Sequence, residues 1–193
     1  MDGRVKTLNP LIYGGILNRI GIDDDIQKEY GMINLDLMVI NLYPFEETIS
    51  GNNANETDAI ENIDIGGPSM IRASAKNFYN KAILTDPKDY ESLMDELKRN
   101  DCSVSETTRR NLSIKAFKKT AIYDSMIHDY LSSKVEKELL PDEIPLGLKK
   151  ITSLRYGENP HQSAGLYVSN KKENTLANAE IHQGKELSYN NFL

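Results

Sequence analysis

The sequence predicts an α/β fold with a parallel sheet. Two apolar runs, at 35–42 (LDLMVINL) and 81–85 (KAILT), are each followed two residues later by a proline, and a helical segment lies between them after Gly66-Gly67-Pro68. Nearly continuous apolar runs are typical of strands that are buried on both faces, as parallel strands usually are. A strand, a helix and a second strand in this order form the crossover unit that joins parallel strands.

The remaining elements of the first part of the chain are predicted to be helical. Between the two strands, a polar loop and a short helix precede a helix that contains Met70 and Ile71. After Pro87, apolar residues recur at helical spacing, with acidic residues early and basic residues late, as the helix dipole favours. These apolar positions are Tyr90, Leu93, Met94 and Leu97.

A long amphipathic helix is predicted next. The segment 103–106 (SVSE) fits a capping box, in which a serine and a glutamate three residues later satisfy the first amides of a helix. The apolar positions of this helix are Leu112, Phe117, Ala121, Ile122, Met126 and Tyr130.

The composition of 133–150 predicts a linker, because Pro141 and Pro145 stand there among charged residues. The expected organisation is therefore a first domain over 1–132, the linker, and the beginning of a second domain over 151–193.

Composition and charge exclude several classes of protein. The 193 residues are 39% hydrophobic, which is too apolar for a disordered chain, and no apolar run approaches the roughly 18–20 residues that cross a bilayer. Lys and Arg number 23 against 29 Asp and Glu, so the net charge is −6, and the basic residues are scattered. We therefore expect neither a nucleic acid nor a membrane as a partner, and any bound anion must meet a small local cluster.

The cysteine and histidine residues limit the expected cellular location and the expected metal chemistry of the protein. Cys102 is the single cysteine and cannot form an internal disulfide, so a cytoplasmic location is expected. His128 and His182 are isolated from other metal-ligating residues, and we predict no metal site.

Two segments could bind an anion. In an extended chain, Arg4 and Lys6 point to the same side and, with Thr7, could hold a phosphate; the alternative is a solvated basic terminus. Gly66 and Gly67, before a proline, predict a turn whose backbone amides bind an oxyanion at a helix N-terminus. The alternative there is an ordinary loop-to-helix transition with Asp64 near the cap.

Three further positions carry reactive side chains. Tyr43 follows the first predicted strand, at the edge where open α/β sheets bind ligands, although packing alone also explains a tyrosine there. Lys76 lies about three helical turns beyond Asp64, too far for a direct pair unless the helix ends early, and is otherwise a surface lysine. The segment 155–162 (RYGENPHQ) gathers a cation, a phenol, a carboxylate, an amide and an imidazole, or is a polar turn.

Several motifs in register resemble one family. These are GRVKTL, GGIL, NLYPF, ENIDIGGP, RASAKN, IKAFKKTAIYD, RYGENPHQ and GKELSYNN. They occur in the same order in the bifunctional purine biosynthesis enzymes that carry AICAR transformylase and IMP cyclohydrolase, and the resemblance covers essentially the whole chain. Asn9 and Tyr13 depart from it, because the family usually has histidines at these positions.

The resemblance implies a methylglyoxal-synthase-like first domain, with a parallel sheet flanked by helices, and an α/β transformylase domain that begins near RYGENPHQ. In the family, further strands and phosphate-binding turns precede GRVKTL, and most of the transformylase domain follows the last motif. The chain is therefore expected to be an internal piece, and the full-length protein a homodimer.

The implied chemistry is formyl transfer from 10-formyltetrahydrofolate to AICAR, giving FAICAR, and dehydrative closure of FAICAR to IMP. The cyclohydrolase step needs no cofactor, and 10-formyltetrahydrofolate is a co-substrate of the transformylase. The resemblance places cyclohydrolase catalysis on Lys6, Tyr43, Asp64 and Lys76. It places nucleotide contacts on Arg4, Lys6, Thr7, Asn41, Asp64, Ile65, Gly66 and Gly67. It places transformylase substrate contacts on Arg155, Tyr156 and His161.

Two alternatives to an enzyme remain at this stage. One is a non-catalytic, phosphate-binding regulatory module of the same fold, and the other is an inactive truncation. The presence of Tyr43, Asp64 and Lys76 together with Lys6 favours catalysis, because a sensor needs anion donors but no proton-transfer groups.

Overall fold

The computed structural model describes residues 8–51, 55–135, 140–169 and 175–192. The chain divides into two compact units, Met1–Ile127 and His128–Leu193, and each is described by itself. None of the described helices is long and apolar enough to cross a membrane.

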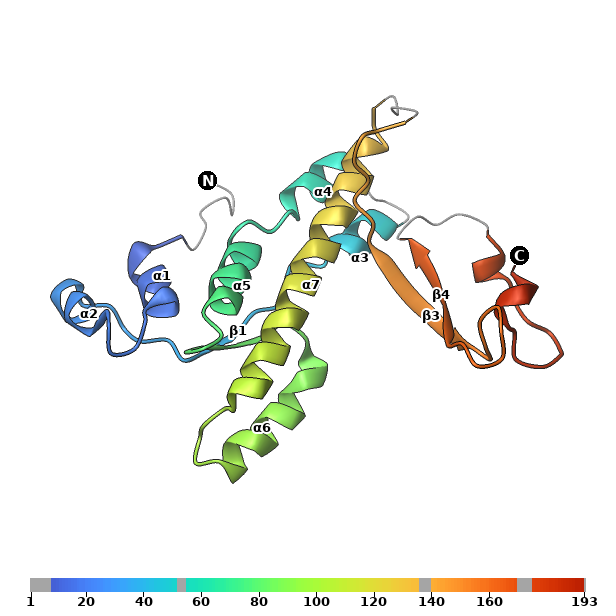
Figure 1. Ribbon diagram of the computed structural model, residues 1–193. Helices are drawn as coiled ribbons and strands as arrows, with labels where there is room; N and C mark the ends of the chain where they lie inside the picture. The colour runs from blue at the N-terminus through green and yellow to red at the C-terminus, as the bar shows by residue number, and fades with distance from the viewer. Residues whose placement is uncertain (1–7, 52–54, 136–139, 170–174, 193) are drawn as a thin grey trace. The chain divides into compact units, whose positions relative to one another are not determined.

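The first unit contains a parallel pair of strands. β1 (Leu37–Val39) pairs with β2 (Ala82–Leu84), with Met38 opposite Ile83, and helix α5 (Gly66–Lys76) lies between them in the sequence (Figure 1). The predicted α/β class with a parallel sheet is therefore confirmed. Helices α3 (Phe45–Ser50) and α4 (Glu56–Glu61) fill the connection from β1 to α5, where the sequence predicted one short helix.

The prediction that both strands are buried on both faces is correct for β2 and wrong for β1. All three residues of β2 are buried, whereas in β1 only Met38 is buried, and Leu37 and Val39 are 41% and 51% exposed. Met38 packs into the core with Ile83, and the opposite face of β1 has little cover among the described residues. An apolar run indicates that a strand can be buried, but it does not show which face of the strand other elements pack against.

Four more α-helices belong to the described part of the first unit. α1 (Pro10–Leu17) begins at Asn9, whose side chain accepts the Leu11 N–H at 2.8 Å, and α2 (Asp24–Tyr30) follows. The helix predicted after Pro87 is confirmed as a 3₁₀ turn, η1 (Pro87–Asp89), that leads into α6 (Tyr90–Arg99). The long helix is confirmed as α7 (Glu106–Ser132).

The predicted capping box at 103–106 is wrong by two residues. Ser105, not Ser103, caps α7: its Oγ accepts the Thr108 N–H at 3.2 Å. The Ser105 N–H donates to Oε1 of Glu96, on α6, at 2.8 Å, so a glutamate distant in sequence takes the part that the motif gives to Glu106. The hydrogen bonds from Ser105 and Thr108 to this carboxylate lower the pKa of Glu96.

The core of the first unit lies between α1, α5, α7 and the strands. Its buried members are Ile16, Met38, Ile71, Ala73, Ala75, Ile83 and Ala116. α7 buries a stripe of mostly small side chains, and the predicted core residue Phe117 is 39% exposed. Small residues let two helices approach closely. The stripe comprises Leu112, Ser113, Ala116, Thr120, Tyr123, Ser125 and Met126.

The second unit is built on an antiparallel hairpin. β3 (Leu148–Leu154) pairs with β4 (Ala164–Ser169), with an irregularity between Lys150 and Thr152. The first residues of β3 fall inside the segment predicted as a linker. Short 3₁₀ turns, η2 (Leu176–Asn178) and η3 (Tyr189–Asn191), complete this unit.

Candidate functional site

The carboxyl end of β1 and the N-terminus of α5 meet at Gly67. A Cβ atom at this position would lie 2.9 Å from Cγ of Asp64 and 3.0 Å from Cδ2 of Leu42, closer than side chains pack. Glycine lets Leu42 of the NLYPF motif and Asp64 of the DIGGP motif lie against the same turn, and any larger residue requires these two side chains to move. Two of the segments singled out in the sequence are thereby brought together.

Asp64 caps α5. Its Oδ1 accepts the Gly67 N–H at 2.8 Å, where the N-terminal end of the helix dipole favours a carboxylate. This is the structural alternative that the sequence left open for Asp64. Gly66 and Gly67 are buried, whereas Ile65 is 51% exposed. An oxyanion that binds the Gly67 amide has to displace or share the Asp64 carboxylate.

Tyr43 and Asn41 present polar side chains at the end of β1. Tyr43 is 47% exposed, and its carbonyl accepts the Phe45 N–H at 2.8 Å, which folds the chain into a tight turn. The Asn41 amide donates from Nδ2 to Oη of Tyr90, the first residue of α6, at 3.1 Å. The candidate site therefore combines Asn41 and Tyr43 with the segment 64–67 at one edge of the sheet, as expected for ligand binding by α/β folds.

A residue that the sequence analysis missed, Tyr123, lies behind this site. Its Oη accepts the Asp64 N–H at 2.8 Å and its O–H donates to the carbonyl of Asn62 at 3.3 Å. Its ring packs edge-on against Phe45, with centroids 6.1 Å apart. Burial raises the pKa of Tyr123, so its hydroxyl stays protonated at neutral pH. A hydroxyl at a helical core position, three residues after Thr120, was the available signal.

The structure does not bring Lys76 to Asp64. α5 is continuous from Gly66 to Lys76, and a rise of 1.5 Å per residue places its two ends about 15 Å apart. Lys76 is exposed beside an open pocket of about 530 Å³ between α1, α5 and α7. Tyr13, Arg72 and Phe117 also line this pocket. The predicted residues Arg4, Lys6 and Thr7 lie outside the described residues.

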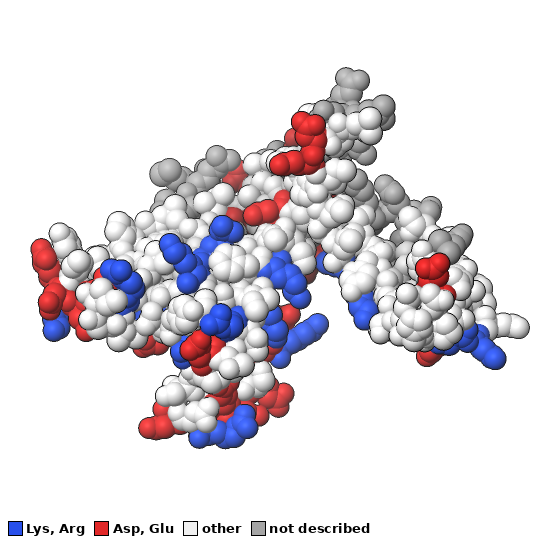
Figure 2. Space-filling view, viewed as in Figure 1, with Lys and Arg blue, Asp and Glu red and all other residues white. Residues whose placement is uncertain are grey.

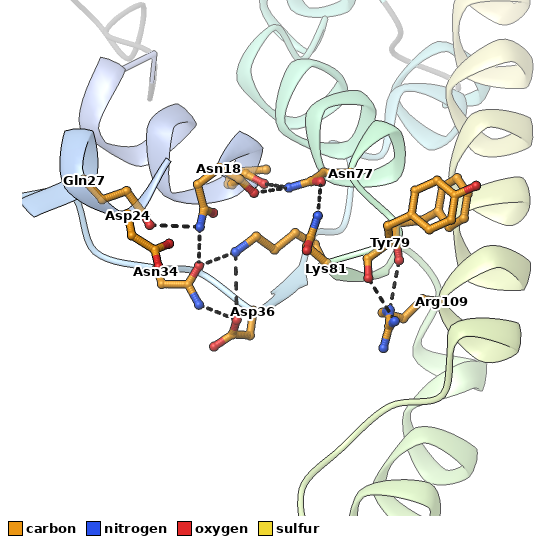
Figure 3. A network of polar contacts seen from close by, with 12 residues as sticks. Asn18, Asp24, Gln27, Asn34, Asp36, Asn77, Tyr79, Lys81 and Arg109 are labelled. Atoms are coloured by element: carbon orange, nitrogen blue, oxygen red, sulfur yellow. Dashed lines mark hydrogen bonds and ion pairs between the residues drawn. The ribbon is translucent and has the colours of Figure 1, made fainter. Parts of the chain in front are cut away.

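A polar network around the buried Lys81 lies beyond the C-terminal end of α5 (Figure 3). Lys81 is fully buried; its ammonium donates to Oδ1 of Asn34 and lies 3.8 Å from a carboxylate oxygen of Asp36. Oδ1 of Asn34 also accepts from Asn18, at 2.9 Å. Burial lowers the pKa of Lys81, and Asp36 opposes this effect. Asn77, the residue after α5, donates to the carbonyls of Ile16 and Asn18 and fastens the end of α1.

In the second unit, Arg155 and Tyr156 form one polar group. Nη2 of Arg155 donates to Oη of Tyr156 at 3.2 Å, and the guanidinium lies 4.9 Å from the centre of the ring. The hydrogen bond from Arg155, with a smaller contribution from Ser188, lowers the pKa of Tyr156. The Tyr156 carbonyl accepts the Tyr189 N–H at 3.1 Å, so the RYGENPHQ and GKELSYNN motifs are adjacent.

His161 is exposed in the turn of the second unit. The Gly157 N–H donates to the Gln162 carbonyl at 2.8 Å and closes this turn. Among the residues that the structure describes, no three His, Cys, Asp or Glu side chains gather in a way that could hold a metal ion. Lys and Arg side chains lie among Asp and Glu on the face shown in Figure 2, in agreement with the scattered charge of the sequence.

Comparisons with known proteins agree with the resemblance. The bifunctional purine biosynthesis protein PurH of Xanthomonas euvesicatoria pv. vesicatoria (strain 85-10) is 46% identical over 99% of this chain, and so is that of Xanthomonas oryzae pv. oryzae (strain PXO99A). The chain spans 38% of the length of each of these relatives. The crystal structure of ForH is similar with a TM-score of 0.59 and 31% identity, covering 71% of each chain. A family model described as AICARFT/IMPCHase bienzyme matches residues 74–193, more than half of the sequence. The chain therefore belongs to the AICARFT/IMPCHase bienzyme family.

Proposed function

We propose that this chain carries most of the cyclohydrolase half of a bifunctional purine biosynthesis enzyme and the beginning of its transformylase half. The single observation that carries the proposal is that Leu42, which lies between Asn41 and Tyr43 in the chain, meets Asp64 around Gly67 at one edge of the sheet. A methylglyoxal-synthase-like architecture for residues 1–132 belongs to the same proposal, with 133–150 as a linker and 151–193 as the start of the transformylase domain. The protein acts in the cytoplasm as a homodimer.

The proposed reaction closes FAICAR to IMP. The carboxamide nitrogen attacks the formyl carbon, a proton passes from nitrogen to the formyl oxygen, and water leaves. Tyr43, an exposed phenol at the end of β1, donates a proton to the oxygen. Asp64 accepts a proton from the carboxamide, and the amide of Gly67, which donates to Oδ1 of Asp64, holds this carboxylate in place. Arg4, Lys6 and Thr7 hold the phosphate, and Lys6 assists at the formyl oxygen.

Lys76 has a different place in the proposal. Its amine extends roughly 6 Å from its backbone, which is short of the about 15 Å that separate the two ends of α5. We therefore assign proton transfer to Lys6, Tyr43 and Asp64, and treat the expected catalytic role of Lys76 as a separate hypothesis. A Lys76→Met variant tests it.

The transformylase half is proposed to begin at Arg155 and Tyr156. The guanidinium and the phenol, held together at 3.2 Å, suit the phosphate and the ring of AICAR, and His161 lies on the adjoining turn. The formyl group comes from 10-formyltetrahydrofolate, a co-substrate, and no cofactor enters the cyclohydrolase step.

The test measures FAICAR conversion to IMP by a full-length protein that carries this chain. Tyr43→Phe and Lys6→Ala are each expected to lose most of the rate, because each removes a proton-transfer group. Tyr79→Phe, which removes another exposed phenol elsewhere on the first unit, is the matched control and is expected to keep the rate. Unchanged turnover in Tyr43→Phe and Lys6→Ala would refute the mechanism, and IMP binding without turnover by the unmodified protein would favour a regulatory module.

A further inference from the structure

We propose that Tyr123 is a positioning residue of the cyclohydrolase reaction, one that holds the loop bearing Tyr43 and the loop bearing Asp64 in a fixed relation. The inference rests on the proposed function. Tyr123 comes from α7 and follows the two loops by about 60 and 80 residues, so it joins them from a third element, in addition to their meeting at Gly67.

The hydroxyl of Tyr123 is fully engaged at the Asp64 loop. It accepts the Asp64 N–H at 2.8 Å, so its own proton points to the Asn62 carbonyl at 3.3 Å. Asp64 is then held at both ends, because its backbone is bound by Tyr123 and its carboxylate by the Gly67 N–H. Removing the hydroxyl leaves the Asp64 amide without this acceptor in a partly buried position, and the loop shifts to find another.

The ring of Tyr123 acts on the second loop. Its edge meets the ring of Phe45 at an interplanar angle of 69°, and both residues are almost completely buried, at 3% and 1% exposed. The Phe45 N–H donates to the Tyr43 carbonyl at 2.8 Å, so a displacement of Phe45 moves the backbone of Tyr43. One rigid, buried side chain therefore sets the positions of both proton-transfer residues.

The alternative is that Tyr123 only packs. The two interpretations differ in what Tyr123→Phe does, since phenylalanine keeps the ring and loses only the hydroxyl. A packing role lowers stability and leaves turnover unchanged. A positioning role lowers kcat about 10- to 100-fold, because a displacement of about 1 Å near reacting groups has effects of that size, and changes KM less than about threefold, since the phosphate is held elsewhere.

Thr120→Val is the matched control. Thr120 lies one turn earlier on the same buried stripe, is 1% exposed, and donates its hydroxyl to the Phe117 carbonyl within α7. This variant also removes one buried hydroxyl, but one whose hydrogen bond stays within α7. It is expected to lower Tm to a similar extent and to keep kcat. Phe45→Leu, which spares the Tyr123 hydroxyl, is the second variant if Tyr123→Phe fails to melt cooperatively, and we expect kcat to fall about 3- to 10-fold.

The kinetics are measured on a full-length protein that carries this chain, with FAICAR as the substrate. A loss of kcat in Tyr123→Phe, but not in Thr120→Val, supports the proposal, and turnover within threefold of the unmodified protein overturns it while the proposed function stands. Absence of turnover in the unmodified protein overturns the proposed function and the reaction role together. In that case the amide NMR shifts of Asp64 and Gly67 still decide whether Tyr123 sets their backbone, and unchanged shifts in Tyr123→Phe refute that contact.

Discussion

Replacing the buried Lys81 by methionine is predicted to stabilise the protein. The Lys81 side chain is fully buried, and taking an ammonium group out of water costs several kcal/mol. Its ion-pair partner, Asp36, is 3.8 Å away and has a side chain that is 71% exposed, so water screens the attraction. At 3.8 Å the attraction is about 1 kcal/mol in bulk water and about 4 kcal/mol at an effective dielectric constant of 20, and the exposure of Asp36 favours the lower value.

Methionine matches the length of the lysine stem without its charge, and the neighbours that remain keep partners. Oδ1 of Asn34 still accepts from Asn18 at 2.9 Å, and Nδ2 of Asn34 still donates to Asp36 at 2.5 Å. We therefore expect the free energy of unfolding to rise by about 1–3 kcal/mol at pH 7, since a buried ion pair is often replaced by apolar groups without loss.

The pH dependence of the free energy of unfolding tests whether the buried Lys81 is destabilising. Burial lowers the pKa of Lys81 in the folded protein, so between this lowered pKa and the unfolded value near 10.5 the unfolded chain binds more protons. The stability of the unmodified protein therefore rises with pH across this window, and the burial penalty applies in full below it. The advantage of Lys81→Met is largest at pH 7 and shrinks toward pH 10.5.

Urea unfolding followed by circular dichroism measures the effect, because the chain contains no tryptophan to serve as a fluorescent probe. Lys88→Met, at an exposed position only seven residues later, is the matched control and is expected to change stability by less than about 0.5 kcal/mol. A loss of more than 1 kcal/mol in Lys81→Met, at an unchanged urea dependence, would show that the hydrogen bond and ion pair outweigh the burial penalty.

Two further substitutions test the contacts that shape the first unit. Gly67→Ala places a methyl group 3.0 Å from the Leu42 side chain and against the Asp64 carboxylate, and is expected to lower stability by about 1–3 kcal/mol and to abolish most FAICAR cyclisation. Gly51→Ala is the control, because its Cβ meets only atoms at 3.8 Å, and it should behave like the unmodified protein in both assays. Arg109→Lys removes a planar guanidinium that donates to three backbone carbonyls, two of them at 2.9 Å. It is expected to lower the free energy of urea unfolding by about 1–3 kcal/mol. A change under about 0.5 kcal/mol would contradict a stabilising role for these hydrogen bonds.

The sequence predicts elements better than the contacts between them. The strand at 81–85 was predicted correctly because β2 is covered on both faces and its apolar run reports that directly. The start of α7 was misplaced because Asp101 and Cys102 adopt left-handed backbone angles, with φ of +49° and +58°, and the helix begins two residues later than the motif suggests. No local pattern shows that non-glycine residues take such angles.

The candidate site was predictable in part for the same reason. The end of β1 and the start of α5 follow from the strand-helix-strand order, so the meeting of Tyr43 and Asp64 at one edge could be inferred from topology. The network around Lys81 could not be inferred from the sequence, because Lys81 lies at the edge of an apolar run and its partner Asn34 is 47 residues away. Tyr123 belongs to the IKAFKKTAIYD motif, but its role depends on contacts to Asp64 and Phe45, each more than 55 residues away in the sequence.

Helix α5 separates two groups of polar residues in the first unit, the turn at Asp64 and the network around Lys81. At its N-terminus, Asp64 and Gly67 form a capped turn beside an exposed tyrosine, a surface that a small anionic ligand can reach. Beyond its C-terminus, Asn77 and the buried Lys81 enter a polar network that contacts the end of α1 and the segment before β1. The about 15 Å between these ends exceeds the distance over which substitutions usually interact, so stability can be adjusted at Lys81 without altering the geometry at Asp64.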